Sequence, residues 1–419
     1  MNVCVIGSGG REHALCYKIK QSKKLKKLFC LPGNPGTAKI CENLVVDISD
    51  FNQIYISILE KKIDLVIVGP EVPLVNGIVD FLSEKKIKVF GPSKQASRLE
   101  GSKIFMKNLC KKFEIPSAKY FEIKSLEEAN KVIDTINVPI VVKSDGLAAG
   151  KGVTICKTKD EAINDINNIL KGKFSSSNKV IVEEFLEGEE VSYFVITDGK
   201  NFKQIGTAQD HKKIGENDMG LNTGGMGAYS PSLIIDENLE EKIIRKIIIP
   251  TINGMEKLGC PYKGILYAGL MISNNEPKLI EYNIRFGDPE CQVLMMRLKD
   301  DLLDLIISSI KGSLDSKKTK WSKDPSITIV AASKGYPESF EKFKEIKNLP
   351  NNQEKNIQIF HAGTTEKNGK ILSNGGRVLN ATVMLSDLKS SRKKALELLD
   401  DLEWEDKYYR RDIGWRAIK

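Results

Sequence analysis

A glycine-rich stretch between two strand-like segments, VVKSDGLAAGKGV at residues 141–153, constrains the fold more than any other part of this sequence. An apolar strand at residues 139–143 leads into it, and the β-branched residues that follow Gly152 predict a second strand. We therefore expect a β-hairpin whose tip is the segment 144–152. The spacing excludes a Walker A loop, which has four residues between its glycines, a Ser or Thr after the lysine, and a helix behind it.

The hairpin tip has the composition of a phosphate-binding loop. Glycines let backbone amides approach an anion closely, and Lys143 and Lys151 flank the loop with positive charge. The hairpin would then act as a flap that closes over phosphate groups. The alternative is a surface hairpin that is merely rich in glycine. Motifs elsewhere in the chain are needed to choose between these two interpretations.

Length and composition restrict the class of protein. A chain of 419 residues can hold two to four domains, and 41% apolar with 28% charged residues is typical of a soluble globular protein. The net charge of +9 is spread along the chain, which favours a solvated surface over a nucleic-acid-binding face and suits phosphorylated substrates. The eight cysteines form no C-x-x-C pair, which argues for a reducing compartment without disulfides or structural zinc. A core strand begins at residue 3 and no apolar run nears the ~20 residues of a membrane helix, so we expect a cytoplasmic protein without a signal peptide or membrane segment.

The first hundred residues alternate between strands and helices. Strands are predicted at residues 2–6, 28–31, 65–68 and 88–90, and each ends in a glycine turn. This pattern predicts a doubly wound parallel sheet, in which ligands bind at the carboxyl ends of the strands. We therefore expect a Rossmann-like domain over residues 1–102 that carries half of a substrate site.

The first of these glycine turns, GSGGRE at residues 7–12, does not fit a dinucleotide. An NAD site would need a glycine where Glu12 stands and an acidic residue after the second strand, where the chain has Pro-Gly-Asn. The turn can still bind a monophosphate through the amides of Gly9 and Gly10 and the side chain of Arg11, because these groups lie at a helix N-terminus.

The middle of the chain predicts a second, α+β region. A linking helix is expected at residues 103–113, and Thr158 caps a helix at 159–170. A strand at 179–186 ends in a group of acidic residues, and strands at 191–197 and 203–208 form a hairpin. The stretch 209–231 shows no periodicity, so we expect a long substrate lid there rather than a disordered segment. Single helices are expected at 240–258 and 289–312.

Two polar residues near the end of a strand suggest a metal site. Strands are predicted at residues 264–271 and 278–283, and Glu281 and Asn283 alternate on the second, so both side chains face one side. A pair of hard oxygen ligands beside phosphates is how proteins hold Mg²⁺. Two exposed strand-end residues are the alternative, but Arg285 and Asp288 follow directly and favour the metal site.

From about residue 325 the sequence predicts a third domain of α+β type. Strands are expected at residues 327–332, 357–360 and 377–384, and an amphipathic helix at 388–402. No motif in this part is diagnostic by itself.

Nine motifs, in order along the whole chain, carry a resemblance to a known family. They are GSGGREHAL, GPEVPLVNG, SDGLAAGKGV, VEEFLEGEE, QDHK, NTGGMGAYSP, RFGDPE, NGGR and DIGWRAI. The flap, the acidic strand end and the metal pair resemble ATP-grasp enzymes, and the motifs together resemble the phosphoribosylamine–glycine ligase family, also called glycinamide ribonucleotide synthetase. The resemblance implies a multidomain α/β and α+β fold, with an N-terminal Rossmann-like parallel sheet, a central ATP-grasp domain (103–312, with a lid at 115–188) and a small C-terminal α+β domain (325–419).

The resemblance also implies an activity and a set of site residues. The enzyme would join glycine to 5-phosphoribosylamine through a glycyl phosphate, giving glycinamide ribonucleotide, ADP and phosphate in purine biosynthesis de novo. It would use ATP with Mg²⁺ or Mn²⁺, bind no nucleic acid, and exist as a monomer or small homo-oligomer. The implied nucleotide-binding residues are Lys107, Lys143, Ser144, Gly146, Gly150, Gly152, Glu183, Glu184, Phe185, Leu186 and Glu190. The implied metal ligands are Glu281 and Asn283, and the implied catalytic residues are Arg285, Asp210 and Lys212, with His211 grouped beside them. The implied binding residues for glycine and phosphoribosylamine are Gly9, Gly10, Arg11, Glu12, Asn222, Gly224, Gly225 and Asp288.

The sequence departs from the ATP-grasp pattern at one place, and two other functions stay open. Many ATP-grasp enzymes carry a further metal-binding acid on the strand before Glu281, and residues 267–272 contain none, which leaves the ligands of a second metal ion undecided. One alternative function is another ATP-grasp carboxylate–amine ligase or a carboxylase of purine biosynthesis, and the GSGGREHAL and NTGGMGAYSP motifs argue against a carboxylase. The other is a nucleic-acid binder that uses the positive charge, which leaves the acidic strand end unexplained.

Overall fold

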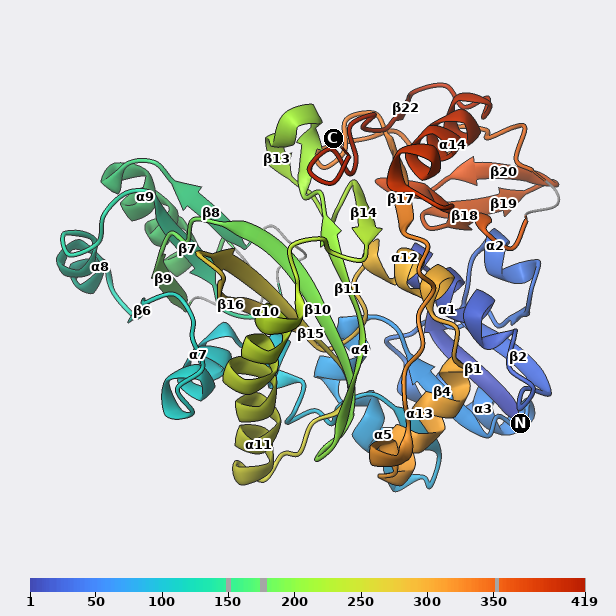
Figure 1. The fold of residues 1–419 in the computed structure, drawn as a ribbon, viewed down its shortest axis with the longest axis horizontal. Coiled ribbons are helices and arrows are strands. Elements are labelled where there is room, and N and C mark those ends of the chain that lie inside the picture. Colours follow the sequence, from blue (N-terminus) through green and yellow to red (C-terminus); the bar gives the residue numbers. More distant parts are fainter. Residues whose placement is uncertain (148–151, 174–178, 351–353, 419) are drawn as a thin grey trace.

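The N-terminal region forms the parallel sheet that its alternating pattern predicts. Residues 1–147, 152–173, 179–350 and 354–418 are described by the computed structural model of the chain, drawn in Figure 1. The strands lie in the order β3-β2-β1-β4-β5, and each neighbouring pair is parallel. All four residues of β4 are buried, as in strands covered on both faces. The elements are β1 (Asn2–Gly7), α1 (Gly10–Ile19), β2 (Lys27–Pro32), α2 (Pro35–Ala38), β3 (Glu42–Asn43), α3 (Phe51–Glu60), β4 (Leu65–Val68), α4 (Glu71–Asn76), α5 (Ile78–Glu84) and β5 (Lys88–Phe90).

Two helices lead from this sheet into a small lid with a core of its own. The lid sheet has the order β6-β9-β7-β8, and its neighbouring strands are antiparallel. Apolar side chains from these strands and from α8 and α9 form a separate hydrophobic cluster. The elements are α6 (Arg98–Gly101), α7 (Lys103–Lys112), β6 (Tyr120–Ile123), α8 (Leu126–Ile133), β7 (Ile140–Ser144), β8 (Val153–Cys156), α9 (Lys159–Leu170) and β9 (Val180–Glu184).

A large antiparallel sheet joins the middle of the chain to its C-terminal part. Its order is β16-β15-β10-β11-β14-β17-β21-β18, with β22 paired to β17. Because β14 pairs with β17, the C-terminal strands extend the central sheet across the predicted domain boundary. The strands are β10 (Glu189–Asp198), β11 (Phe202–Asp210), β14 (Gly227–Ser230), β15 (Lys263–Ser273), β16 (Glu276–Asn283), β17 (Ser326–Ser333), β18 (Ile357–His361), β21 (Arg377–Met384) and β22 (Lys407–Tyr408).

Helices and two short hairpins complete the described chain. The hairpins are β12 (Lys213–Gly215) with β13 (Met219–Asn222), and β19 (Thr364–Lys367) with β20 (Lys370–Ser373). The helices are α10 (Glu237–Ile243), a π-helical turn (Ile244–Ile248), α11 (Ile249–Lys257), α12 (Glu290–Arg297), α13 (Leu302–Lys311) and α14 (Leu388–Asp400), with 3₁₀ turns at Glu216–Asp218 and Leu314–Ser316.

Two expectations about these elements are wrong, and a third is confirmed with a local irregularity. The stretch 209–231 is not a long loop, because it forms the β12–β13 hairpin and then β14, which is buried between β11 and β17. The expected helix at 289–312 is two helices, since Leu298 adopts an extended conformation and the Asp301 side chain caps a new helix start. The expected helix at 240–258 contains a π-helical turn in its middle.

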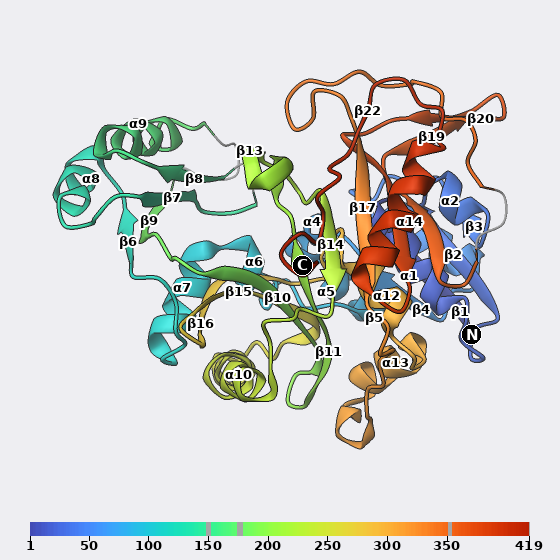
Figure 2. The same ribbon diagram turned by 45° about the horizontal axis from the view of Figure 1, so that its top comes forward.

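The regions are arranged so that the lid stands at one end of the molecule. Figures 1 and 2 both place the lid sheet far from the N- and C-terminal regions, which lie together at the other end with the long strands β10 and β15 between. Helix α12 packs against α1 and against the strands β14, β17 and β21. The segment between β16 and α12 therefore lies where the N-terminal sheet, the central strands and the C-terminal region meet.

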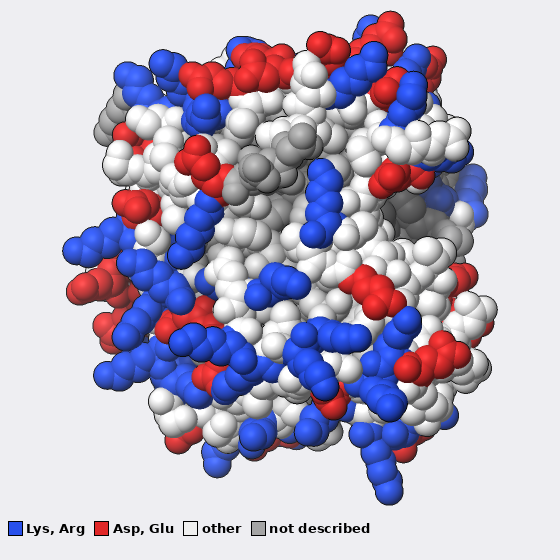
Figure 3. All heavy atoms as spheres, turned by 90° about the vertical axis from the view of Figure 1, so that its right-hand side faces the viewer, with Lys and Arg blue, Asp and Glu red and all other residues white. Residues whose placement is uncertain are grey.

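Two expectations drawn from composition concern the charged surface and membrane-spanning helices. On the face drawn in Figure 3, Lys and Arg side chains predominate in the lower half with Asp and Glu among them, and the upper rim carries both signs. In the described part of the chain, no helix is both long enough and apolar enough to cross a membrane.

Candidate active site

A buried triad of charges lies at the base of the lid. Lys107 comes from α7, Lys143 from β7 and Glu183 from the neighbouring strand β9. The Glu183 carboxylate lies 3.2 Å from Lys107 Nζ and 2.9 Å from Lys143 Nζ, and all three side chains are at most 5% exposed. Burial lowers the pKa of Lys107, and the charge of Glu183 opposes that effect. Both lysines that were expected to approach the nucleotide phosphates are thus held in place by one carboxylate.

The start of the flap is tied to the linking helix. The Asp145 carboxylate accepts hydrogen bonds from Ser102 Oγ and from the Ile104 amide, each at 3.2 Å. Lys103 Nζ donates to the carbonyl of Gly146 at 2.9 Å. The first residues of the flap are therefore fixed to the N-terminus of α7. Ser144 is buried and its amide donates to the carbonyl of Gly152, whereas Gly150 and Lys151 lie outside the described residues.

The predicted metal pair lies at the end of β16, in the midst of positive charge. Glu281 pairs with Gly269 and Asn283 with Tyr267, and the register shifts beside Glu281, as in a β-bulge. Burial raises the pKa of Glu281, but Lys212, Lys143 and Lys103 outweigh burial, so the pKa is lowered and the group is a carboxylate at neutral pH.

An anionic oxygen beside an amide oxygen fits a hard divalent cation such as Mg²⁺ or Mn²⁺. Within the described ranges no three His, Cys, Asp or Glu side chains converge to hold a metal ion. A cation at Glu281 and Asn283 would therefore complete its shell with water and with oxygens of a bound phosphate. Lysines from three different elements, α7, β7 and the segment after β11, supply the positive charge that such a phosphate needs.

The segment that joins the lid to the central sheet has the position of a hinge. Residues 185–188 connect β9 of the lid with β10 of the large sheet, and Phe185 is exposed while Leu186 is half-buried. Glu184 Oε1 accepts a hydrogen bond from the Lys119 amide at 3.1 Å. Gly188 has φ +147°, and a Cβ there would lie 2.3 Å from the carbonyl oxygen of Ile272, so only glycine fits.

A second charged group lies around the end of β11. Lys212 Nζ lies 2.6 Å from Glu190 Oε2, and both side chains are partly exposed. Burial raises the pKa of Asp210 to about 7, with Glu290 and Glu190 adding to the effect and Lys212 opposing it. His211 is separated from these two residues, because it is buried and its Nε2 accepts a hydrogen bond from the Gly414 amide at 2.9 Å.

Arg285 points toward the N-terminal region. Its Nε lies 3.1 Å from Glu71 Oε2 and its NH2 lies 3.2 Å from Glu100 Oε1. Burial lowers the pKa of Arg285, but Glu100 and Glu71 outweigh it and keep the guanidinium charged. The NH1 group of Arg11 lies 3.9 Å from the same Glu71 oxygen, so two guanidinium groups converge on one carboxylate.

The first glycine turn is filled by its own helix. The Gly9 amide donates to Glu12 Oε2 at 2.7 Å, and Arg11 Nε donates to Glu12 Oε1 at 2.5 Å. A Cβ on Gly69 would lie 2.2 Å from Glu12 Oε1, so the carboxylate occupies the space between the ends of β1 and β4. This is where a dinucleotide-binding turn would place its phosphates, which supports the argument against NAD. Gly10 faces the C-terminal region, since its Cβ would meet Asn380 at 2.4 Å.

The remaining predicted substrate residues gather beside β21. Arg377 NH1 donates to the Gly224 carbonyl at 2.6 Å and to the Gly225 carbonyl at 3.4 Å. The same group donates to the backbone carbonyl of Asp288 and lies 3.6 Å from its carboxylate. Asn222, by contrast, is exposed on the β12–β13 hairpin.

Sequence comparison identifies the family. Profiles of the N domain, the ATP-grasp (A) domain and the C domain of phosphoribosylglycinamide synthetase match residues 1–100, 101–291 and 326–416. The phosphoribosylamine–glycine ligase of Mesorhizobium japonicum is 50% identical over 419 residues, which cover 100% of this chain and 99% of that protein. The chain belongs to the phosphoribosylamine–glycine ligase family. The chloroplastic phosphoribosylamine–glycine ligase of Arabidopsis thaliana is 47% identical, over 98% of this chain and 79% of that protein.

Solved structures agree with this family. The phosphoribosylamine–glycine ligase of Thermotoga maritima has a TM-score of 0.86 at 34% identity, covering 99% of this chain and 100% of that chain. Biotin carboxylase from Campylobacter jejuni has a TM-score of 0.75 at 16% identity, covering 99% of this chain and 94% of that chain, which shows a shared fold alone. Membership of the phosphoribosylamine–glycine ligase family makes the chain an ATP-dependent ligase and confirms the predicted fold class.

Three charged residues that contact the site were not predicted from the sequence. Glu100 lies on α6, Lys103 on α7 and Arg377 on β21. Each contacts a predicted site residue that is far from it in sequence. Arg377 belongs to the quoted NGGR motif, so its position in a motif was the available signal.

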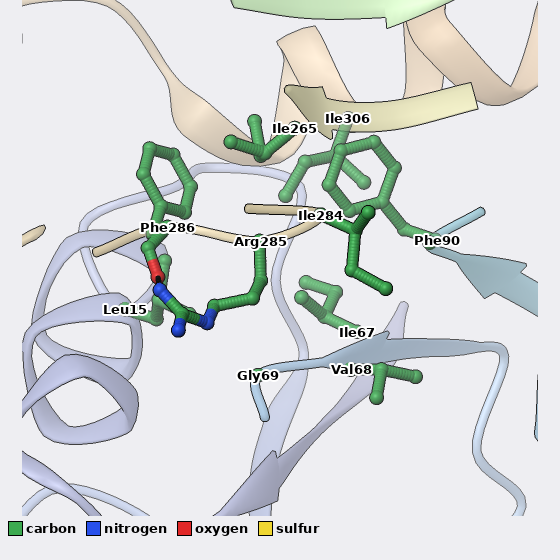
Figure 4. Close-up of a pocket in the computed structure, with 11 residues that line it drawn as sticks. Leu15, Ile67, Val68, Gly69, Phe90, Ile265, Ile284, Arg285, Phe286 and Ile306 are labelled. Atoms are coloured by element: carbon green, nitrogen blue, oxygen red, sulfur yellow. Dashed lines mark hydrogen bonds between the residues drawn. The ribbon is translucent and has the colours of Figure 1, made fainter. Parts of the chain in front are cut away.

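The cavity in Figure 4 belongs to packing rather than to the site. Apolar side chains such as Ile67, Phe90 and Ile284 surround it, and Arg285 passes along it with the guanidinium beside the Phe286 carbonyl. Its free space is about 10 Å³, which is room for about one water molecule. It is therefore too small for a substrate.

Proposed function

We propose that this protein ligates glycine to 5-phosphoribosylamine at the expense of ATP, in purine biosynthesis de novo. A carboxylate does not acylate an amine in water unless it is activated. Transfer of the γ-phosphoryl group to glycine would give glycyl phosphate, and attack by the amine of phosphoribosylamine would give glycinamide ribonucleotide and release phosphate. ADP is the other product.

The observation that carries this proposal is the convergence of cations on Glu281. Lys103, Lys143 and Lys212 all lower the pKa of that carboxylate, and they come from both sides of the lid hinge. Two of these lysines also pair with Glu183 and Glu190, and a site with this many fixed charges suits a polyanion that carries a divalent cation. Catalysis of phosphoryl transfer rests largely on such positioning and charge neutralisation.

The nucleotide would lie between the lid and the central sheet. Ser144, Gly146, Gly150 and Gly152 of the flap would cover the phosphates together with Lys143, and Lys107 would approach them from α7. Residues 183–186 would contact the adenine through the backbone of the hinge. Glu190 would accept hydrogen bonds from the ribose hydroxyls, in competition with its ion pair to Lys212.

Glu281 and Asn283 would hold Mg²⁺ or Mn²⁺, which when bound supplies charge neutralisation at the transferring phosphate. Lys212 would then be free to contact the phosphate or the glycine carboxylate. Arg285 would stabilise the negative charge that develops on the acyl phosphate, and it would do so from the N-terminal side, where Glu71 and Glu100 hold it.

The acceptor amine would bind on the N-terminal side of the same space. The Gly9–Gly10 turn, Arg11 and Asp288 lie together there, because the Arg11 amide donates to Asp288 Oδ2 at 3.3 Å. The Gly9 amide already donates to Glu12, so a phosphate at this turn would have to replace that bond.

The test is ADP release by the purified protein. We expect release that depends on glycine and on phosphoribosylamine generated in situ, with glycinamide ribonucleotide detected by mass spectrometry. Release that depends on bicarbonate instead of glycine would support the carboxylase alternative. Tight, salt-sensitive binding to DNA or RNA without ADP release would support the nucleic-acid alternative.

A further inference from the structure

The guanidinium of Arg377 joins two loops that come from distant parts of the chain. Arg377 begins β21 in the C-terminal region. It binds the carbonyls of Gly224 and Gly225, which precede β14, and the carbonyl of Asp288, which precedes α12. Charge-assisted hydrogen bonds of this kind are stronger than neutral ones and fix geometry.

The first loop is shaped to lie against this guanidinium. A Cβ on Gly224 would lie 3.0 Å from Arg377 Cζ, which is tighter than ordinary contact. Gly225 has φ +111°, and a Cβ there would lie 2.5 Å from Cδ of Pro289. Gly225 is therefore required by its backbone conformation and by Pro289, and a side chain at Gly224 would push the Arg377 guanidinium away.

The same loop is held from its other side. The Gly224 amide donates to the hydroxyl of Tyr336 at 3.0 Å, and the Gly225 amide donates to Thr223 Oγ1 at 3.0 Å. Tyr336, like Arg377, belongs to the C-terminal part of the chain. The Gly224 amide and the carbonyls of Gly224 and Gly225 are thus bound by residues that lie more than a hundred positions away.

The second loop leads to the proposed catalytic residue. Asp288 stands three positions after Arg285, and its carboxylate accepts from the Arg11 amide at 3.3 Å and from Gln292 Nε2 at 3.1 Å. Burial raises the pKa of Asp288, but Arg377 and Arg11 outweigh burial and lower it. Arg377 therefore holds both the backbone and the charge of the segment that carries Arg285.

We propose that Arg377 is a positioning residue for the acceptor side of the reaction. It connects the loop before β14 to the segment between β16 and α12, so that both present a fixed surface to glycine and phosphoribosylamine. It acts through these loops and does not contact the nucleotide, whose proposed site lies at Lys143 and Glu281. The proposal rests on the proposed function, because it names the substrates that the two loops face, whereas the contacts of Arg377 can be tested without that function.

Hydrogen exchange gives a readout that does not depend on activity. Amide exchange by mass spectrometry would compare the wild type with Arg377→Met, Arg377→Lys and the control Arg392→Met on α14. We expect faster exchange in the peptides that cover residues 219–226 and 285–290 in both Arg377 variants. The effect should be smaller in the Lys variant, which keeps the charge but not the planar fork. The lid peptides at 140–144 should be unchanged.

Steady-state kinetics give the second readout. For Arg377→Lys we expect kcat/KM for phosphoribosylamine to fall about tenfold to a hundredfold, as for small misplacements of a substrate, while KM for ATP stays within about twofold. A uniform rise of all three KM values would overturn the proposal, because it would indicate general damage. Wild-type exchange in residues 219–226 of the Lys variant would also overturn it. If the wild-type protein showed no ligase activity, the proposed function would be refuted. The hydrogen-exchange comparison would still test whether Arg377 holds the two loops.

Discussion

Replacing Glu183 with Gln should weaken the lid strongly, because it leaves two buried ammonium groups without their carboxylate. At separations of 3.2 and 2.9 Å each ion pair has a gross attraction of about 5 kcal/mol at an effective dielectric constant of about 20. Desolvation of the three groups offsets much of this. Removing one partner of a buried ion pair nevertheless costs about 3–5 kcal/mol, because the remaining charges stay buried.

The assay is hydrogen exchange of the strands β7 and β9, whose local opening the change should favour. A loss of 3–5 kcal/mol corresponds to about two to four orders of magnitude in the opening equilibrium. Glu187→Gln serves as the control, since Glu187 is exposed, and should alter exchange in these strands little. Adding Lys143→Met to Glu183→Gln should restore part of the protection by removing one uncompensated charge. Exchange in Glu183→Gln within about threefold of the wild type would refute this account of the triad.

Three further changes test other parts of the site. Arg285→Ala should abolish product formation and also destabilise the protein by about 1–3 kcal/mol at pH 8, because it leaves the buried Glu100 carboxylate without its counter-charge. Burial raises the pKa of Glu100, so denaturant unfolding should show a smaller loss as the pH is lowered. Wild-type turnover would remove Arg285 from the mechanism. The pKa of Asp210 is raised to about 7, so its proton stabilises the folded state at low pH and this contribution is lost as pH rises through 7. The difference in melting temperature between Asp210→Asn and the wild type should therefore shift in favour of the variant between pH 5 and pH 8. A constant difference would contradict the raised pKa. Glu281→Gln should raise the Mg²⁺ concentration for half-maximal ADP release by at least the roughly tenfold that loss of an outer-sphere partner costs; an unchanged Mg²⁺ titration would show that the metal lies elsewhere.

The elements that the sequence predicts correctly are those with a clear local signal, such as an apolar run or a helix cap. The β4 strand and the Thr158-capped helix α9 have the predicted bounds, because an apolar run marks the strand and an N-cap threonine marks the helix start in the sequence itself. The strand β14 was missed because all four of its residues are buried, so no alternation of polar and apolar residues marks it. The break between α12 and α13 was missed because apolar residues continue through Leu298.

The site residues divide in the same way, into those that a local pattern marks and those whose partners lie far away in the sequence. The Glu281–Asn283 pair could be found because both residues lie on one strand with a spacing of two. The partners of Arg285 and of the Gly224–Gly225 loop could not be found in this way. Glu100 stands 185 positions before Arg285, and Arg377 stands 153 positions after Gly224, so only the folded chain brings them together. Motif resemblance named the residues but not these contacts.

The most direct test of the account is a crystal structure with a non-hydrolysable ATP analogue and Mn²⁺, whose anomalous signal locates the metal. We predict Mn²⁺ bound to Glu281 and Asn283, with the β- and γ-phosphates beside Lys143 and under the flap. A triphosphate bound elsewhere, with these two side chains unliganded, would contradict the proposal that this cationic pocket activates the carboxylate.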